Sequence, residues 1–445
     1  MPRGDDILTI IAESTPPGQG GISIIRMSGP DSLYYLSKIA KTKNTSFVPR
    51  RVYHRKLWDQ NNNLIDHGLI TFFKSPSSYT GEDAGEISCH GSPFIVERIL
   101  SYLVSIGASI APPGEYTKRA FLNGKLNLLQ AEAVGEIISA RTKRAVSLNL
   151  KILDENDAGV LKKTKQDIVL VASKVEHALD ISDEDLSGDF VLGLLKSITY
   201  ISEKLKTYLE NYEHNQRYLR PQVVVLFGKP NVGKSTLFNA LLKKDRAITS
   251  ATPGTTRDTI EHEIFIGGVC VRLIDTAGTR ETSERVEAEG VRRTAEAVLE
   301  SDLILHVIEG VDNIELEGQK IKVYNKNDVI KYKKQTTGQD APSVYISAKS
   351  GAGLEALKEK IYTSLVGEKE PASSSVVTTA RQLQALKNSQ ASLKKALDIL
   401  GSAAPQIELV AFELRASINA LSDLLGSTNT ENILENVFEN FCVGK

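Results

Sequence analysis

The stretch Gly228-Lys229-Pro230-Asn231-Val232-Gly233-Lys234-Ser235 constrains this chain more than any other. It follows the apolar run 223–227, which predicts a buried parallel strand, and it precedes residues 236–242, which predict a helix. Strand, glycine loop and helix are the context of a phosphate-binding loop, because the loop amides and the helix N-terminus then face phosphate oxygens. The pattern predicts that Lys234 reaches the β and γ phosphates and that the Ser235 hydroxyl ligates Mg²⁺.

Further motifs indicate which nucleotide binds. Asp275-Thr276-Ala277-Gly278 follows the strand-like run 271–274, where Asp275 can hold Mg²⁺ through water and the Gly278 amide can reach the γ phosphate. Asn325-Lys326-Asn327-Asp328 follows the run 321–324. Asp328 would accept hydrogen bonds from guanine N1–H and the 2-amino group, and adenine offers neither donor.

Two remaining stretches complete the set. Ser347-Ala348-Lys349 follows the run 344–346 and supplies a backbone amide for the guanine oxygen. Residues 252–258 form a predicted switch loop with Thr256 on Mg²⁺. Each motif is weak alone, but all of them in this order predict a GTPase rather than an ATPase.

Composition bounds the alternatives. The 445 residues are enough for two to four domains. The formal charge of −1 does not indicate bulk attraction to nucleic acid, although a local patch stays open. Cys89, Cys270 and Cys442 are too widely spaced for a disulfide framework or a metal cluster, which favours a reducing compartment. We found no spanning apolar run and no targeting pattern, so we expect a cytoplasmic protein without a membrane segment.

The pattern of elements predicts α/β and all-α parts. Residues 1–118 read as an N-terminal α+β domain, with strands at 7–11, 22–27 and 69–73 and helices at 31–42 and 93–105. Residues 119–218 read as helical, with segments at 130–153, 162–181 and 192–218. Residues 219–367 form the nucleotide domain. Only 22 residues separate Asp302 from Asn325, so its helix there should be shortened or replaced by a loop.

Residues 368–445 read as helical again after a linker, with helices at 380–400 and 406–425. Leu409, Phe412, Ile418, Leu421 and Leu425 are expected to form one apolar face of the second. The economical inference is one discontinuous helical domain into which a P-loop, Ras-like GTPase domain is inserted.

Motifs outside the nucleotide domain resemble one family. They are Thr15-Pro16-Pro17-Gly18-Gln19-Gly20-Gly21 with the strand after it, Gly81-Glu82-Asp83, Cys89-His90-Gly91, residues 120–126 and the terminal Phe441-Cys442-Val443-Gly444-Lys445. With the GTPase motifs, they make the chain similar along its whole length to the MnmE (TrmE) family of tRNA-modification GTPases. Ser92 stands where a second glycine is usual, and the nucleotide domain is shortened before Asn325.

The resemblance implies an N-terminal folate-binding and dimerising domain, a helical domain and an inserted GTPase domain. It implies a homodimer that joins a flavoprotein, MnmG (GidA), in a heterotetramer or larger complex. Together they would add an aminomethyl-type (carboxymethylaminomethyl) group at C5 of the wobble uridine of certain tRNAs. The one-carbon donor would be 5-formyltetrahydrofolate or a related tetrahydrofolate, bound by Arg26, Glu86, Lys125 and Lys445.

The resemblance also bears on hydrolysis. Thr279 stands where Ras-type GTPases carry a water-orienting Gln, so another group must act. By resemblance Glu287 is the catalytic residue, and Cys442 matters for tRNA modification near the folate pocket. The family binds K⁺ with the side chains of Asn231 and Thr255 and the carbonyls of Ser250 and Thr252, where a cation replaces an arginine finger.

The predicted ligands of GTP or GDP therefore share the loops named above. They are Asn231, Val232, Gly233, Lys234, Ser235, Thr236, Ser250, Ala251, Thr252, Pro253, Gly254, Thr255, Thr256, Asp275, Thr276, Ala277, Gly278, Asn325, Lys326, Asp328, Ser347, Ala348 and Lys349. Cys89-His90 could be read as a catalytic pair, but a packed strand end is the favoured interpretation.

Three other functions stay open at this point. An Era-type ribosome-assembly GTPase would need an RNA-binding domain of KH type, and none is apparent after residue 367. A folate-dependent aminomethyltransferase with a vestigial nucleotide site is disfavoured by the intact Lys234, Ser235, Asp275 and Asp328. A GTP-switch scaffold without chemistry of its own is the third.

Overall fold

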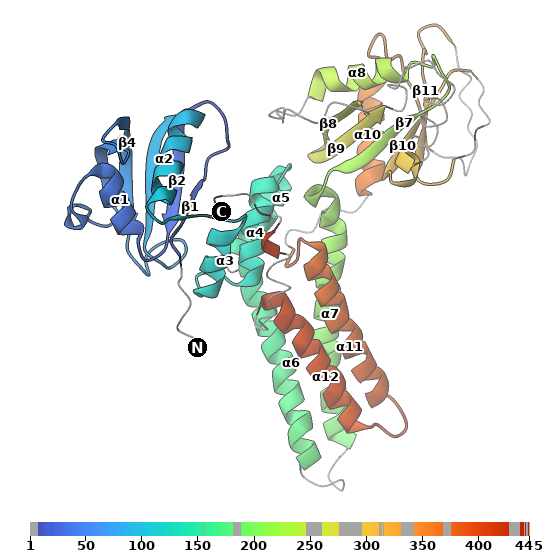
Figure 1. Cartoon of the computed structure of the whole chain (residues 1–445). Coiled ribbons are helices and arrows are strands. Elements are labelled where there is room, and N and C mark those ends of the chain that lie inside the picture. The colour runs from blue at the N-terminus through green and yellow to red at the C-terminus, as the bar shows by residue number, and fades with distance from the viewer. Residues whose placement is uncertain are drawn as a thin grey trace. The chain divides into compact units, whose positions relative to one another are not determined.

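The structure is a computed structural model of the chain. It describes residues 8–154, 156–180, 188–245, 260–275, 296–310, 314, 316–330, 342–367, 375–426, 437–439, 441 and 444. The chain divides into two compact units (Figure 1). The first comprises Met1–Gly135, Ile152–Leu195 and Ala391–Lys445, and the second comprises Glu136–Lys151 and Lys196–Gln390.

A six-stranded sheet organises the N-terminal part of the first unit, in the order β3-β4-β5-β2-β1-β6. Its strands are β1 (Ile10–Glu13), β2 (Gly20–Ser28), β3 (Val52–Trp58), β4 (Leu64–Phe73), β5 (Ala84–Gly91) and β6 (Ser109–Ile110). All pairs are antiparallel except β1 with β6. The α1 (Ser32–Ala40) and α2 (Pro93–Ser105) helices bury one apolar core against the sheet.

Two expectations for this sheet need correction. The strand predicted at 7–11 corresponds to β1, which spans Ile10–Glu13 after Leu8 and Thr9, and neither β3 nor β6 was predicted. The β3 sequence, Val-Tyr-His-Arg-Lys-Leu-Trp, carries charged residues on an edge strand, so its apolar alternation is weak.

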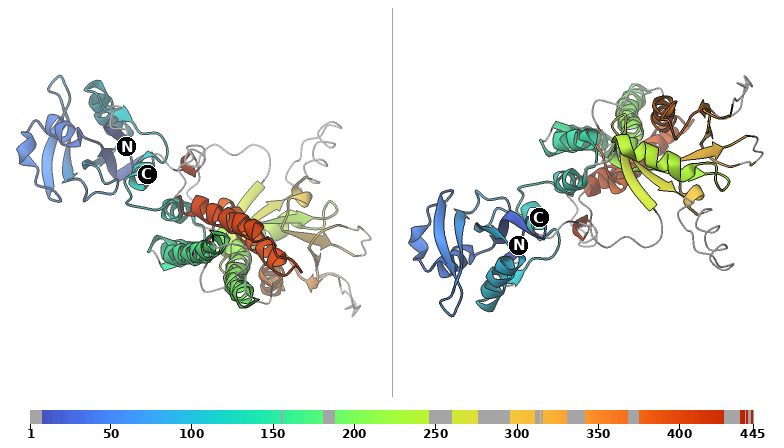
Figure 2. Two further views of the ribbon diagram at one scale, coloured as in Figure 1. Left: turned by 90° about the horizontal axis from the view of Figure 1, so that it is seen from below. Right: turned by 90° about the horizontal axis from the view of Figure 1, so that it is seen from above.

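Helices make up the rest of the first unit. They include α3 (Glu115–Leu122), α6 (Asn156–Asp180) and α12 (Ile407–Leu425), and the last two run side by side (Figure 1 and Figure 2). Arg415 of α12 donates to Glu176 of α6 at 2.8 Å. In the part of the chain that the structure describes, no helix is both long and apolar enough to cross a membrane.

The expected apolar face of α12 was wrong at its first two positions. Leu409 and Phe412 are 46% and 67% exposed, whereas Ile418 and Leu425 are half-buried and Leu421 is buried. The buried stripe includes small residues, which a search for large apolar side chains passes over. Its members are Ile407, Val410, Ala411, Leu414, Ser417, Leu421, Ser422 and Leu424.

The stretch 130–153 forms two helices rather than one, α4 (Leu128–Ser139) and α5 (Lys143–Leu153). Thr142 separates them, because its hydroxyl accepts a hydrogen bond from the Ala145 amide at 3.0 Å and so caps α5. The same hydroxyl donates to the Tyr218 carbonyl at 2.7 Å. Tyr218 lies in the last turn of α7 (Gly188–Leu219), and its hydroxyl contacts that of Tyr362 at 3.1 Å.

The second unit contains a six-stranded sheet in the order β12-β11-β10-β7-β9-β8. Its strands are β7 (Gln222–Phe227), β8 (Ile260–Ile266), β9 (Val269–Asp275), β10 (Leu303–Ile308), β11 (Lys320–Tyr324) and β12 (Ser343–Tyr345). All neighbours are parallel except β8 with β9, and β8 was not predicted. The α8 (Lys234–Asp245) and α10 (Leu354–Val366) helices share one core with this sheet (Figure 1).

The short connection before Asn325 agrees with the prediction from its length. Residues 309, 310, 314 and 316–319, which are the described part of the β10–β11 connection, contain no helix. The helices expected at 93–105 and 380–400 coincide with α2 and α11 (Ala380–Leu400).

Candidate functional site

The phosphate loop joins β7 to α8 and depends on residues without a side chain. A Cβ on Gly228, which has a φ of 153°, would lie 2.3 Å from the Val307 carbonyl oxygen. A Cβ on Gly233 would lie 2.3 Å from the Asn325 side-chain nitrogen. Asn231 adopts a φ of 67°, a left-handed conformation that Asn tolerates better than most residues. The loop therefore closes as the sequence predicted, directly before the N-terminus of a 12-residue helix.

Lys234 lies at the centre of this loop and is 7% exposed. Its ammonium group donates to the carbonyl oxygens of Gly228 and Lys229, at 2.7 and 2.9 Å. Burial lowers the pKa of Lys234, and the negative charge of Asp275 partly opposes that effect. Among the described residues, no carboxylate lies within ion-pair distance of Lys234, so its charge is available to an anion in the loop.

Oxygen donors for a divalent cation lie beside Lys234. Asp275 ends β9, is 3% exposed, and is in register with Leu226 of β7. Ser235 and Thr236 are exposed in the first turn of α8. A carboxylate and a hydroxyl are the ligand types that Mg²⁺ prefers, so the described residues fit that ion.

Asn325 connects the phosphate end of the site to the opposite end. It follows β11, is 2% exposed, and its amide nitrogen donates to the Val232 carbonyl at 2.8 Å. Its side-chain oxygen accepts from the Ala348 amide at 3.0 Å. The sequence predicted Asn325 as a nucleotide ligand, but it did not reveal this joining role, which depends on contacts across three loops.

Asp328 lies at the rim of the same edge, where its carboxylate is exposed. A hydrogen bond from the Ser347 hydroxyl holds the pKa of Asp328 below its ordinary value. The carboxylate is therefore ionised and oriented as an acceptor at neutral pH. Lys326 adopts a φ of 63°, and its ammonium pairs with Glu309, a contact that no sequence motif indicated.

Several predicted ligands lie outside the described residues, so their placement stays a prediction. In the nucleotide domain they are Ser250, Ala251, Thr252, Pro253, Gly254, Thr255, Thr256, Thr276, Ala277, Gly278 and Glu287. Near the chain end they are Cys442 and Lys445.

The described folate candidates lie in the first unit and only partly converge. Arg26 of β2 and Glu86 of β5 are cross-strand neighbours, and the Arg26 guanidinium donates twice to Glu86 Oε1, at 3.0 and 3.1 Å. Arg26 also donates to the Gly444 carbonyl at 3.4 Å, which brings the terminal segment to this pair. Lys125 is exposed and donates to the Pro76 carbonyl at 3.1 Å, on the loop that carries Tyr79.

This group of residues suits a polar, partly aromatic ligand. The rings of Tyr79 and Tyr116 each lie 5.9 Å from the Arg26 guanidinium carbon. Both bonds from Arg26 go to one oxygen of Glu86, which leaves Oε2 for a donor edge. A pterin offers such a donor edge, so the residues fit it, although Arg26 and Glu86 form one ion pair rather than two separate contacts.

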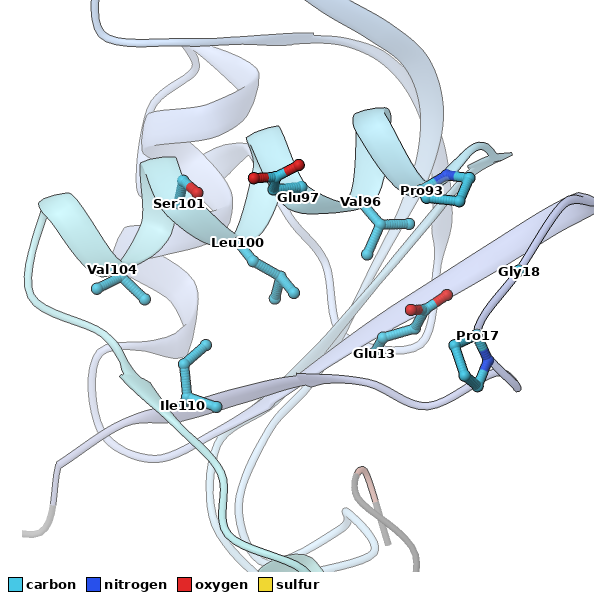
Figure 3. A pocket seen from close by; sticks show the side chains of 10 residues that line it. All are labelled: Glu13, Pro17, Gly18, Pro93, Val96, Glu97, Leu100, Ser101, Val104 and Ile110. Carbon is cyan, nitrogen blue, oxygen red and sulfur yellow. The ribbon is translucent and has the colours of Figure 1, made fainter. Parts of the chain in front are cut away.

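A separate apolar pocket of about 440 Å³ lies between α2 and the strand edge (Figure 3). Leu100 and Val104 face Ile110 there, and Glu13 supplies a carboxylate. None of the predicted folate or nucleotide ligands lines it.

The Cys89-His90 stretch is a packed strand end, as favoured: burial raises the pKa of Cys89 to about 11, and His90 Nδ1 lies 2.8 Å from Asp66.

The geometry defines a class of protein. A largely parallel sheet carries a glycine loop, a strand-end Asp and the Asn325–Asp328 loop at its carboxyl edge, which is the arrangement of a P-loop GTPase.

Comparison with known proteins identifies the family. A family model described as the GTP-binding protein TrmE N-terminus matches residues 9–125, and one described as the MnmE helical domain matches residues 128–442. The tRNA modification GTPase MnmE of Thermotoga maritima is 38% identical over 98% of this chain and 100% of that protein. The MnmE protein of Fervidobacterium nodosum is 36% identical over 100% of this chain and 99% of that protein. The MnmE protein of Aquifex aeolicus is 38% identical over 98% of this chain and 99% of that protein. The chain belongs to the MnmE family of tRNA modification GTPases.

Among solved structures, the G domain of the Thermotoga maritima FeoB iron transporter is 28% identical to the part it matches. That match covers 33% of this chain and 99% of the other, with a TM-score of 0.26.

Proposed function

We propose that this chain hydrolyses GTP at the carboxyl edge of the second sheet in the course of tRNA modification. The observation that carries the proposal is the Asn325 side chain, which joins the phosphate loop to the loop around Ala348. That junction fixes the spacing between a phosphate end and a base end, so a single nucleotide can occupy both.

At the phosphate end, Lys234 would exchange the carbonyls of Gly228 and Lys229 for β and γ phosphate oxygens. The exchange is favourable because a buried ammonium gains an ionic partner in place of neutral ones. Ser235 and Asp275 would hold Mg²⁺, which supplies charge neutralisation between the phosphates. The α8 N-terminus adds backbone amides to the same anion.

At the base end, Asp328 would accept from guanine N1–H and the 2-amino group. The hydrogen bond from the Ser347 hydroxyl lowers the pKa of Asp328, and the Ala348 amide, which Asn325 holds in place, lies in the loop expected to contact the guanine oxygen. Binding of ATP would leave the Asp328 carboxylate without those donors, so discrimination against adenine follows.

For hydrolysis we propose Glu287 as the residue that orients the attacking water, and Cys442 as a residue of the modification step. We propose a K⁺ site at Asn231, Ser250, Thr252 and Thr255, of which Asn231 is described and exposed. Glu287→Ala should leave GTP binding intact and remove most turnover, with Glu289→Ala as its matched control. K⁺ should stimulate turnover well above Na⁺; equal rates in the two salts would contradict the K⁺ site.

For the modification step we propose Arg26, Glu86, Lys125 and Lys445 as ligands of 5-formyltetrahydrofolate or a related tetrahydrofolate. The proximity of Gly444 to Arg26 supports a pocket formed near the end of the chain. We further propose a homodimer that works with the flavoprotein MnmG on the wobble uridine. We also propose domain boundaries near residues 118, 218 and 367.

The decisive experiment is mass spectrometry of tRNA from cells that lack this chain. C5-modified wobble uridine should disappear, and it should return with the parent chain but not with Lys234→Ala. Unchanged modification in the cells that lack the chain would refute the function, and would favour a ribosome-assembly role if ribosomal subunits accumulate instead.

A further inference from the structure

One segment of the N-terminal domain concentrates positive charge. Residues 38–56 contain seven Lys or Arg residues and His54, and no Asp or Glu. The whole chain has 54 Lys and Arg and 55 Asp and Glu in 445 residues, so 19 average residues would hold about two of each sign. A chain with a net charge of −1 therefore separates its charges strongly here.

The fold exposes this charge on one edge of the first sheet. The segment runs from the last turn of α1, through the 3-10 helix η1 (Asn44–Ser46), into β3, the terminal strand of the sheet. We name the exposed cations of this segment the basic strip. Its members are Lys38, Lys41, Lys43, Arg50, Arg51 and Lys56.

The basic strip carries uncompensated charge. Among the described residues none of its six members forms an ion pair, whereas Arg26, Arg98 and Arg119 of the same domain each pair with a carboxylate. Lys38 and Lys41 lie over the rings of Tyr34 and Trp58, at 5.1 and 4.4 Å, which positions the ammonium groups without neutralising them. An exposed row of unpaired cations is the electrostatic footprint of a polyanion-binding surface.

We propose that the basic strip binds the phosphate backbone of tRNA. This inference rests on the proposed function, because tRNA is the polyanion that such an enzyme must hold. Lys38 and Lys41 lie at the end of α1, Lys43, Arg50 and Arg51 in the connection that follows it, and Lys56 on β3. None of the six lines a described pocket, which suits an extended backbone better than a small anion. Contacts of this kind position the nucleic acid without reading its sequence.

The test is tRNA binding by the full-length protein, measured by fluorescence anisotropy with labelled tRNA over a series of salt concentrations. The strip variant is Lys43→Gln/Arg51→Gln/Lys56→Gln. The matched control is Lys162→Gln/Lys163→Gln/Lys174→Gln, which removes the same charge from exposed positions of α6. In the described part of the structure, none of these six side chains makes a hydrogen bond or an ion pair, so both variants should fold.

The strip variant should bind tRNA at least about tenfold more weakly than the parent at low salt. Its slope of log affinity against log salt concentration should be shallower by about two to three, because three phosphate contacts are lost. The control should match the parent. Equal losses in both variants, or no loss in the strip variant, would overturn the proposal, and the second result would point to an acidic protein surface as the partner.

The two proposals can fail independently. If cells that lack the chain keep their modified wobble uridine while the strip variant loses tRNA binding, only the proposed function is refuted. If modification depends on the chain but the strip variant binds tRNA like the parent, only the strip assignment is refuted. GTP turnover without tRNA should be the same in the parent and both variants.

Discussion

Replacement of Asn325 by Ala should uncouple the two ends of the nucleotide site. The Asn325 side chain is 2% exposed, and its hydrogen bonds include one to the Val232 carbonyl and one from the Ala348 amide. The shorter side chain removes both bonds and leaves two backbone groups without these partners. Gly233, which tolerates the close approach of this amide, would also face an empty space.

The magnitude follows from the number of groups affected. A buried hydrogen bond contributes about 0.5–1.5 kcal/mol, and a buried group left unpaired costs about 1–3 kcal/mol. Water can reach part of this edge, so the expected total is roughly 2–4 kcal/mol. If the loss appears in nucleotide affinity, it corresponds to about 30- to 1,000-fold weaker binding.

The assay is titration with fluorescent GDP and GTP, in parallel with thermal unfolding. The matched control is Asn327→Ala, in the same loop, because the Asn327 side chain is exposed and only its backbone amide is bonded, to the Ile346 carbonyl. Asn325→Ala should weaken both nucleotides by similar factors, since the junction serves both ends of the site. Parent-like affinity in Asn325→Ala, or an equal loss in Asn327→Ala, would refute the reasoning.

Two further predictions concern carboxylates. Asp328→Asn should weaken GTP binding by at least about tenfold. It should improve binding of xanthosine triphosphate, because the 2-carbonyl of xanthine can accept a hydrogen bond from the new amide. Competition titration measures this preference, and an unchanged preference for GTP would contradict the assignment. Burial raises the pKa of Asp66, but hydrogen bonds from His90 and the His67 amide outweigh it and hold the pKa below its ordinary value. Asp66 therefore stabilises the fold above the unfolded pKa of about 3.9, and that contribution is lost as the pH falls through the lower folded value. Asp66→Asn should flatten the fall in thermal midpoint between pH 6 and pH 3, and an identical pH profile would contradict this.

The sequence was most informative where one local rule determined the structure. The apolar run before Gly228 could only be a buried strand of a parallel sheet, and β7 is flanked by β9 and β10 as that requires. The short β10–β11 connection followed from chain length alone. The α2 boundaries followed from Pro93, whose missing N–H suits the first helical turn.

The misses have physical causes. The β3 edge strand has one uncovered side and many charges, so its alternation does not stand out. The buried face of α12 includes Ala411 and Ser417, whose small size permits close packing but gives no strong apolar signal. The break at Thr142 had a recognisable signal, a helix-capping residue, which the apolar spacing on either side obscured.

The contacts of the sites were beyond sequence reasoning for another reason. Arg26 and Glu86 are 60 residues apart, and their pairing depends on the register of β2 against β5. A shift of one residue would place one of the two side chains on the other face of the sheet. The family resemblance supplied both residues as candidate ligands, but only the assembled strands could show that they form one ion pair.

The contacts of Tyr218 hold one end of the long α7 helix in place. Its 32 residues span about 48 Å at 1.5 Å per residue. Its last turn is fastened to α5 through Thr142 and to α10 through Tyr362, so this end acts as the pivot. A tilt of about 5° at the pivot would displace the opposite end of the same helix by about 4 Å, given that length. An angular change at the Tyr218 end is therefore magnified along the helix in proportion to its length, without any change in the helix itself.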